Sequence, residues 1–184
     1  MTTIHTIGHG ARDIETFVQL LEGAGIRRLA DVRTAPGSRK HPQFGRDALE
    51  ASLGGRGIAY EWYGRELGGW RKSSPDSRHR AIRSPGFRGY ADHMESEEFR
   101  DARDRLIETS ADTPTAVMCA ESLWWRCHRR MLADSLVATG CDVIHVMDGG
   151  RLESHRLSNA ARVEGTSVVY DVPEEESGQR QLTE

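Results

Sequence analysis

The segment "TAVMCAESLWWRCHRRMLADSL" at residues 115–136 decides the fold that the sequence predicts. It opens with an apolar run over 115–119 that is typical of a buried strand, and it ends in a helical pattern with Leu132 and Leu136 one turn apart. A strand followed by a helix is one half of a strand–helix–strand unit. Repeated units of this kind build a mostly parallel sheet.

The rest of the chain repeats this alternation. Further apolar runs typical of strands occur at 3–8, 29–33, 58–63, 142–147 and 167–172. Helical patterns separate them: Asp13 can cap a helix with an apolar face, residues 46–54 form a short helix, and Ser96 can cap another. We therefore expect an α/β fold, a three-layer sandwich with a central sheet of five or six strands and helices on both faces.

The expected domain covers residues 1–172 as a single unit. Within it, residues 64–95 lose hydrophobic periodicity, and 64–88 hold seven Lys or Arg against two acids. A long excursion of this kind is usually functional. We predict that it overhangs the site and contributes Arg65. Residues 173–184 are an acidic C-terminal tail that we expect to be flexible.

Composition restricts the class of protein. Hydrophobic residues make up 37% and charged residues 29%, which is typical of a soluble globular chain. No apolar run has the length of a membrane span, and the N-terminus lacks the features of a secretory signal. Three cysteines are too few for a disulfide scaffold. We expect a cytoplasmic protein with free thiols, no cofactor and no membrane partner.

Chemically reactive residues follow the ends of the predicted strands. The carboxyl ends of parallel strands meet at one edge of a sheet, and this is where such folds bind ligands. We therefore predict one site at this edge. The predicted catalytic residues are His9, Cys119, Glu121 and His128, and the predicted substrate-binding residues are Asp31, Arg33, Ser38, Arg65 and Arg129.

Residues 115–136 supply most of that chemistry. Cys119 ends a strand, and Cys127, His128 and Arg129 are expected in the first turns of the next helix. A helix N-terminus and nearby arginines stabilise a thiolate, so we expect Cys119 to be more thiolate-like than Cys141, which enters a strand and should be an inert core residue. Glu121 is a candidate general base. The alternative is that Cys119 is a buried, inert thiol.

Two other interpretations of this segment stay open. Cys119, Cys127 and His128, with or without His9, are metal-ligating residue types, but the separation of the two cysteines is not that of a typical zinc site. The sequence therefore assigns no metal. The adjacent residues 124–125, both tryptophan, can stack on a base or sugar, or they can simply cover the end of the helix.

Several motifs together carry a resemblance to a known family. They are "TIGHG" at 6–10, "DVR" at 31–33, Pro36 with Ser38 and Phe44, "LGG" at 67–69, Phe87 with Tyr90, and "CAESLWWRCHRR" at 119–130. Over roughly residues 4–147 the chain resembles the domain of unknown function 488 family. The resemblance implies a fold and a site but no reaction. It implies that the pattern residues are His9, Asp31, Arg33, Ser38, Cys119, Glu121, Cys127, His128 and Arg129.

Three functions fit these observations. The first is an enzyme, a hydrolase or transferase, whose arginines hold a phosphate-bearing substrate such as a nucleotide or nucleic acid. The second is a non-catalytic nucleotide or nucleic-acid binding module, in which the basic segment contacts phosphates and the Cys/Glu/His cluster is structural. The third, less favoured, is a redox or metal-binding protein.

Overall fold

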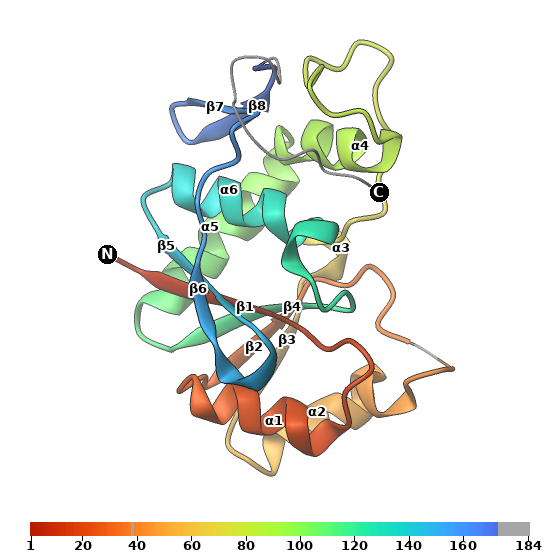
Figure 1. The fold of residues 1–184 in the computed structure, drawn as a ribbon, viewed down its shortest axis with the longest axis vertical. Helices are drawn as coiled ribbons and strands as arrows, with labels where there is room; N and C mark the ends of the chain where they lie inside the picture. Colours follow the sequence, from red (N-terminus) through yellow and green to blue (C-terminus); the bar gives the residue numbers. More distant parts are fainter. Residues whose placement is uncertain (38, 173–184) are drawn as a thin grey trace.

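The structure is a computed structural model that describes residues 1–37 and 39–172. A six-stranded sheet lies at its centre, in the order β3-β2-β4-β1-β5-β6 (Figure 1). The strands are β1 (Thr3–Gly8), β2 (Arg28–Asp31), β3 (Ala59–Trp62), β4 (Thr115–Cys119), β5 (Asp142–Val146) and β6 (Leu152–Ser154). The first five are parallel to one another, and β6 runs antiparallel along β5 at the edge. The expected mostly parallel sheet is confirmed.

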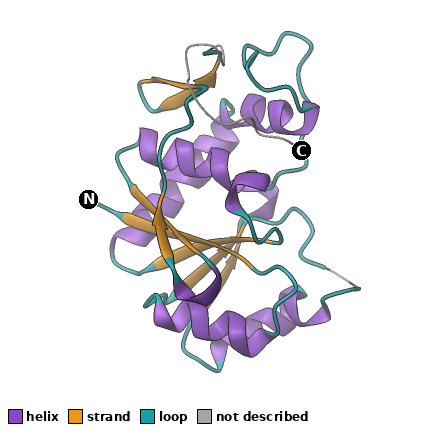
Figure 2. Cartoon of the chain, viewed as in Figure 1, coloured by secondary structure: helices purple, strands orange, loops and turns teal. Residues whose placement is uncertain are grey.

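Helices cover both faces of this sheet (Figure 2). They are α1 (Ile14–Gly23) and α2 (Arg46–Gly54) on one face, and α3 (Gly64–Leu67), α4 (Pro85–Met94), α5 (Glu97–Ala111) and α6 (Arg129–Ala138) on the other. Alternate residues of β4 enter the two cores, since Ala116 and Met118 pack with α1 and α2 while Val117 packs with α5 and α6. This alternation is the expected pattern for a strand buried on both faces, and it confirms the three-layer sandwich.

The predicted helix starts are confirmed by their caps. The carboxylate of Asp13 accepts a hydrogen bond from the backbone N–H of Thr16 at 2.8 Å. The hydroxyl of Ser96 accepts one from the backbone N–H of Phe99 at 3.2 Å. Each cap satisfies a backbone donor that the first helical turn leaves without a partner.

The prediction that 167–172 forms a sixth strand of the main sheet is wrong. β8 (Ser167–Tyr170) instead pairs with β7 (Ala161–Glu164) in a separate two-stranded sheet. Its buried side chains, Val168 and Tyr170, belong to the core on the α4–α6 side. The apolar residues of β8 are therefore buried against helices and not in the main sheet. The short polar strand β6 forms the edge of the main sheet instead.

The segment expected to be one long excursion, 64–95, contains α3 and α4. α4 begins at Pro85, a residue well suited to the first helical turn, and it buries Tyr90 and Met94. The remainder, 68–84, is loop and turn. The predicted tail 173–184 lies outside the described residues. In the described ranges, every helix is too short or too polar to cross a membrane.

The connections of β1 and β4 create a crevice at the carboxyl edge of the sheet. The two strands are neighbours, with Gly8 opposite Cys119. The chain leaves β1 toward α1 on one face and leaves β4 toward α6 on the other face. Loops that diverge in this way from adjacent parallel strands leave a space between them, which is where open α/β sheets bind ligands.

Candidate functional site

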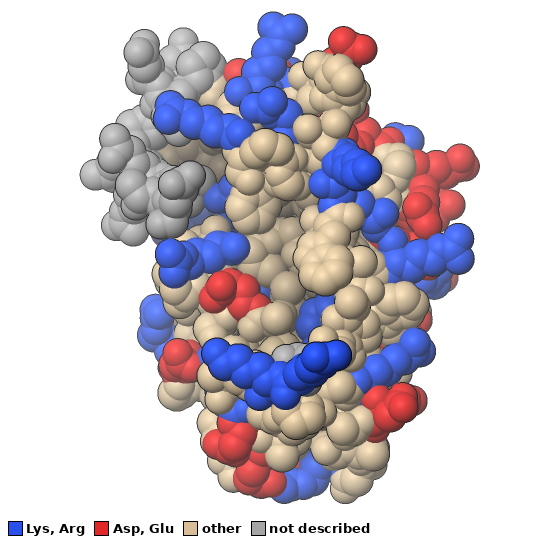
Figure 3. Space-filling view, turned by 90° about the vertical axis from the view of Figure 1, so that its right-hand side faces the viewer, with Lys and Arg blue, Asp and Glu red and all other residues tan. Residues whose placement is uncertain are grey.

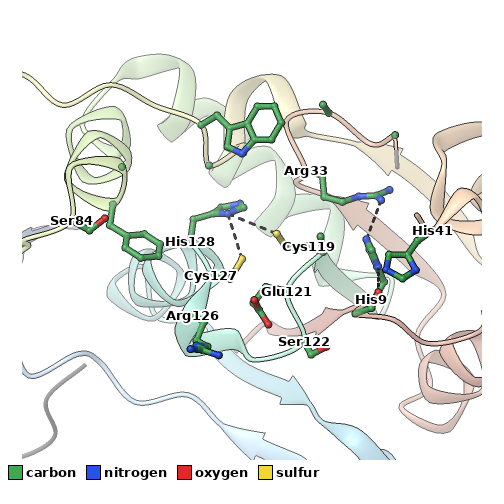
Figure 4. A pocket seen from close by; sticks show the side chains of 18 residues that line it. His9, Arg33, His41, Ser84, Cys119, Glu121, Ser122, Arg126, Cys127 and His128 are labelled. Carbon is green, nitrogen blue, oxygen red and sulfur yellow. Dashed lines mark hydrogen bonds between the residues drawn. The ribbon is translucent and has the colours of Figure 1, made fainter. Parts of the chain in front are cut away.

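A pocket of about 640 Å³ opens at this crevice. Its volume falls within the range of about 300–1,000 Å³ that is typical of small-molecule sites. The face of the molecule drawn in Figure 3 is hollowed near its middle, with Lys and Arg side chains on several sides of the hollow. The polar and aromatic residues lining the pocket are His9, Arg33, His41, Trp70, Ser84, Phe87, Cys119, Glu121, Ser122, Arg126, Cys127 and His128 (Figure 4).

The floor of the pocket depends on a close approach between two loops. The backbone N–H of His9 donates to the carbonyl of Cys119 at 3.0 Å, which continues the pairing of β1 and β4 beyond their ends. A Cβ on Gly8 would lie 1.9 Å from the carbonyl oxygen of Glu121. Only glycine fits there, which explains part of the "TIGHG" motif. The buried guanidinium of Arg129 donates to the same carbonyl and so fixes this loop from behind.

Two thiols and an imidazole meet at one wall of the pocket. Cys119 ends β4, Cys127 follows the short η2 turn (Trp124–Arg126), and His128 occupies the position before the first residue of α6. The Nδ1 atom of His128 lies 3.5 Å from the Sγ of Cys127 and 3.9 Å from the Sγ of Cys119. The three ligand atoms all lie within 4.8 Å of one another, and all three residues are buried. We call these residues the thiol–imidazole cluster.

The expectation that Cys119 is more thiolate-like than Cys141 is not supported, because the pKa of both thiols is raised, that of Cys141 by burial. A hydrogen bond to Cys127, together with burial, raises the pKa of the Cys119 thiol well above its usual range. The reciprocal hydrogen bond lowers the pKa of Cys127 well below that range, with further help from His128 and Arg129. Cys127 is therefore the more acidic thiol of the pair, and it lies next to the N-terminus of α6.

A buried ion pair holds the opposite wall. Arg33 donates through Nε and Nη2 to the two carboxylate oxygens of Asp31, at 2.9 and 2.6 Å. The hydroxyl of Tyr60 also donates to Asp31, at 2.7 Å. Asp31 is fully buried and Arg33 is 7% exposed. The two-pronged geometry fixes the guanidinium plane and leaves Nη1 to face the neighbouring His9.

His9 is a neutral imidazole in this arrangement. Its Nδ1 lies 2.8 Å from the carbonyl of Gly10, so Nδ1 carries the proton and donates it there. Its Nε2 is then the acceptor for Nη1 of Arg33, at 3.3 Å. Burial, reinforced by the charge of Arg33, lowers the pKa of His9 to about 4. The ring also stacks on Phe44, with centroids 4.3 Å apart.

Glu121 and Arg126 are the charged groups most open to solvent in the pocket. Both are exposed and both line it. One carboxylate oxygen of Glu121 accepts a hydrogen bond from the backbone N–H of Leu123 at 3.2 Å, which orients the side chain. Arg126 makes no ion pair with another residue in the part of the chain that the structure describes. The pocket thus combines a carboxylate, two arginines, two thiols and three imidazoles.

The structure brings most of the predicted site residues together. His9, Arg33, Cys119, Glu121 and His128 line the same pocket. Three others lie elsewhere. Asp31 is behind Arg33, Arg129 is buried behind the Glu121 loop, and Arg65 is 78% exposed and pairs with Glu98 at 3.6 Å. Ser38 is outside the described residues. Arg65 is therefore not among the described residues that form the pocket.

Several residues that line the pocket were not among the predicted site residues. Arg126 stands inside the Cys-x-Glu…Cys-His-Arg segment, and Trp70 follows directly after "LGG" at 67–69, so proximity to these motifs was the available signal. Trp70 is 78% exposed at the pocket. Trp124, by contrast, stacks on His145 with centroids 4.2 Å apart, so it has a packing role.

Comparison with known proteins identifies the family. The family profile described as "Domain of unknown function DUF488" matches residues 13–136. No curated protein and no solved structure gives a significant match to the chain. The matched region covers well over half of the chain and includes Arg33, Trp70, Glu121 and the thiol–imidazole cluster. The chain therefore belongs to the DUF488 family.

Proposed function

We propose that this protein is an enzyme, a hydrolase or transferase, that acts on a phosphate-bearing substrate at the pocket, with a nucleotide or nucleic acid as the substrate class. One observation carries the proposal. A single pocket at the crevice between β1 and β4 gathers acid–base groups and thiols beside arginines, with an exposed tryptophan in its lining. Each of these groups has a use in such a reaction.

The arginines support binding of a phosphate group. Arg126 is exposed in the pocket lining without an ion-pair partner among the described residues, so it can pair with an incoming anion. Arg33 is fixed by Asp31 and presents its Nη1 edge beside His9. Guanidinium groups bind phosphate oxygens through strong, charge-assisted hydrogen bonds.

The aromatic residues favour a nucleotide over a bare phosphate. Trp70 is 78% exposed at the pocket, so its ring is available for contact with a ligand. Phe87, half-buried at the start of α4, also lines the pocket and is held by the guanidinium of Arg130 at 4.8 Å. Flat side chains of this kind stack on nucleic-acid bases, at about 1–3 kcal/mol per base.

The carboxylate supports catalysis. Glu121 faces the pocket from the loop that follows β4, two residues after Cys119. A carboxylate held by a backbone N–H beside a bound substrate can accept or return a proton during hydrolysis or group transfer. The neighbouring thiol–imidazole cluster provides a second reactive group within the same pocket.

The proposal is tested by a search for turnover. The full chain is incubated with a panel of nucleotides and short oligonucleotides, and the products are followed by mass spectrometry. We expect one class of phosphate-bearing compound to be consumed. Glu121→Gln should abolish this turnover and still bind the substrate. If no panel member is consumed, the catalytic part of the proposal is wrong.

A second candidate function is a non-catalytic nucleotide or nucleic-acid binding module. The burial of the thiol–imidazole cluster favours it, because buried thiols are often inert packing groups. In that case affinity for DNA or RNA would fall steeply with salt and no substrate would be consumed. The same panel, run as a binding assay at several salt concentrations, separates the two functions.

A further inference from the structure

We infer that Cys119, Cys127 and His128 form a binding site for a transition-metal ion of the Zn²⁺ class, with one coordination position open to the pocket. The inference goes beyond the proposed function, because that function assigns no metal to the pocket. Metal binding can also be measured with no substrate present. Three properties of the cluster support a metal site: the separations of its ligand atoms, their chemistry and their placement in the pocket.

The separations match a tetrahedral site. Zinc binds cysteine sulfur at about 2.3 Å and histidine nitrogen at about 2.0–2.1 Å, so tetrahedral angles place sulfur and nitrogen about 3.5 Å apart. The Nδ1 atom of His128 lies 3.5 Å from the Sγ of Cys127 and 3.9 Å from the Sγ of Cys119. All three ligand atoms lie within 4.8 Å of one another, so small side-chain adjustments can bring them to one ion.

The residue types are those that zinc prefers. Thiolate sulfur and imidazole nitrogen are the usual ligands of Zn²⁺, whereas Mg²⁺ and Ca²⁺ select oxygen. All three side chains are at most 8% exposed. They are held by different elements, Cys119 by the end of β4 and His128 by the start of α6. The site is thus pre-formed by the fold.

The imidazole is also fixed by the surrounding chain. A Cβ on Gly69 would lie 2.5 Å from Nδ1 of His128, so the backbone of Gly69 lies directly against the ring. The ring of Tyr90 meets it edge-on, with centroids 5.0 Å apart. These contacts keep Nδ1 beside the two sulfurs. A ligand held in place loses little conformational freedom when it binds a metal.

The placement is that of a reactive metal site. Structural zinc sites are closed by four protein ligands, whereas catalytic sites have three and leave the fourth position for water or substrate. Cys119, Cys127 and His128 all line the pocket, as do Glu121 and Arg126 (Figure 4). The fourth position is therefore available to water or to an oxygen of a bound phosphate. This geometry was not evident from the spacing of the two cysteines along the chain.

Cobalt is the probe that tests the inference. The full chain is reduced, stripped with a chelator and titrated with Co²⁺, which gives sulfur-to-cobalt charge-transfer absorption and intense visible bands in a tetrahedral thiolate site. We expect one ion per chain, displaced by Zn²⁺. Cys119→Ser, Cys127→Ser and His128→Gln should each weaken binding more than about 100-fold, beyond the range of outer contacts. Cys141→Ser is the matched control and should bind as the wild type does.

A second measurement on the wild-type chain guards against variants that fail to fold. Alkylation is mapped by mass spectrometry with and without Zn²⁺. The inference predicts that the ion protects Cys119 and Cys127 and leaves the rate at Cys141 unchanged. Absence of binding by the reduced wild-type chain would overturn it, as would equal binding by the three ligand variants. Isolation of a stable Cys119–Cys127 disulfide that no metal prevents would also overturn it, in favour of a redox pair.

The two proposals fail separately. If the chain binds one metal ion but consumes no substrate, only the proposed function is refuted. If the chain consumes a phosphate-bearing substrate but the reduced chain binds no metal ion, only the metal site is refuted.

Discussion

Arg33 and Asp31 form a two-pronged ion pair that is buried beneath the pocket, with nitrogen–oxygen distances of 2.9 and 2.6 Å. The pair orients the guanidinium of Arg33 toward His9, so loss of the pair is expected to affect both stability and the pocket. Burial makes the pair costly to break, because the remaining charge would have no compensating partner.

Asp31→Asn should lower the free energy of unfolding by about 3–5 kcal/mol, the usual cost of leaving a buried charge unpaired. Tyr60→Phe is the matched control. It removes only the hydroxyl that donates to the Asp31 carboxylate and should cost less, about 1.5–3 kcal/mol. Urea denaturation followed by fluorescence measures both. An Asp31→Asn variant as stable as the control would show that the pair does not hold this wall.

Gly69→Ala should displace His128 from the thiol–imidazole cluster. The added Cβ would lie 2.5 Å from Nδ1 of the imidazole, so the ring or the 67–69 backbone must move. Overpacking of this kind costs about 1–3 kcal/mol. Gly86→Ala, also in the pocket lining, meets nothing within 4 Å and should leave stability nearly unchanged. Thermal unfolding compares the two variants, and equal midpoints would contradict the packing described for Gly69.

Stability should fall as the pH decreases below about 6.5, in part because of His145. This imidazole is fully buried and stacks on Trp124. It forms hydrogen bonds with the hydroxyl of Thr6 at 2.7 Å and with the ring of His155 at 3.0 Å. Burial, followed by the charges of His155 and Arg129, lowers its pKa from 6.5 to about 3. Between these values the unfolded chain binds a proton that the folded chain does not, so unfolding becomes easier as the pH falls.

The His145→Gln variant isolates that contribution. It should flatten the dependence of unfolding free energy on pH between about 6.5 and about 4, by an amount on the order of a few kcal/mol. Some slope should remain, because burial also lowers the pKa of His9 and His79. The measurement is a series of urea midpoints against pH for both chains. Identical slopes would mean that His145 is not held neutral by the fold.

Trp70 and Arg65 should differ in their effect on ligand binding. Trp70 lines the pocket, whereas Arg65 is exposed and pairs with Glu98. Trp70→Ala should weaken binding of a nucleoside monophosphate by about 1–3 kcal/mol through lost base stacking. Arg65→Ala should leave the affinity unchanged. Isothermal titration calorimetry compares them. The opposite ranking would restore the sequence-based expectation that Arg65 contacts the substrate.

Much of the fold follows from local pattern. The alternation of apolar runs and helical patterns predicted the parallel sheet, and Asp13 and Ser96 marked two helix starts correctly. Where 167–172 would pair could not be predicted, because an apolar run needs burial but does not specify its partner. α4 was missed because Gly86 and Gly89 interrupt its pattern.

The site was predictable in position and less so in detail. Strand ends predicted that His9, Arg33, Cys119 and Glu121 would meet, because parallel strands bring their carboxyl ends together. The approach of Cys119 to Cys127 depends on the path of the loop between β4 and α6, which the residue separation does not reveal.

The sequence also does not show which arginines reach the pocket. The sequence offers many, and only the long-range geometry shows that Arg126 lies in the pocket while Arg65 lies outside it. Arg129, which the motif suggests as a ligand contact, instead holds the carbonyl of Glu121 from behind.

The most direct test of the central claim, that the pocket holds a phosphate-bearing substrate, is a comparison of nucleotide and nucleoside affinity. A nucleoside monophosphate and the same nucleoside without phosphate are titrated into the wild-type chain, Arg126→Ala and the surface control Arg56→Ala. We predict that the phosphate adds about 1.5–3 kcal/mol of affinity in the wild type and in Arg56→Ala, the scale of hydrogen bonds to a charged group, and that Arg126→Ala removes most of this gain. Equal affinity for nucleotide and nucleoside in the wild type, or a phosphate gain that survives in Arg126→Ala, would contradict the claim.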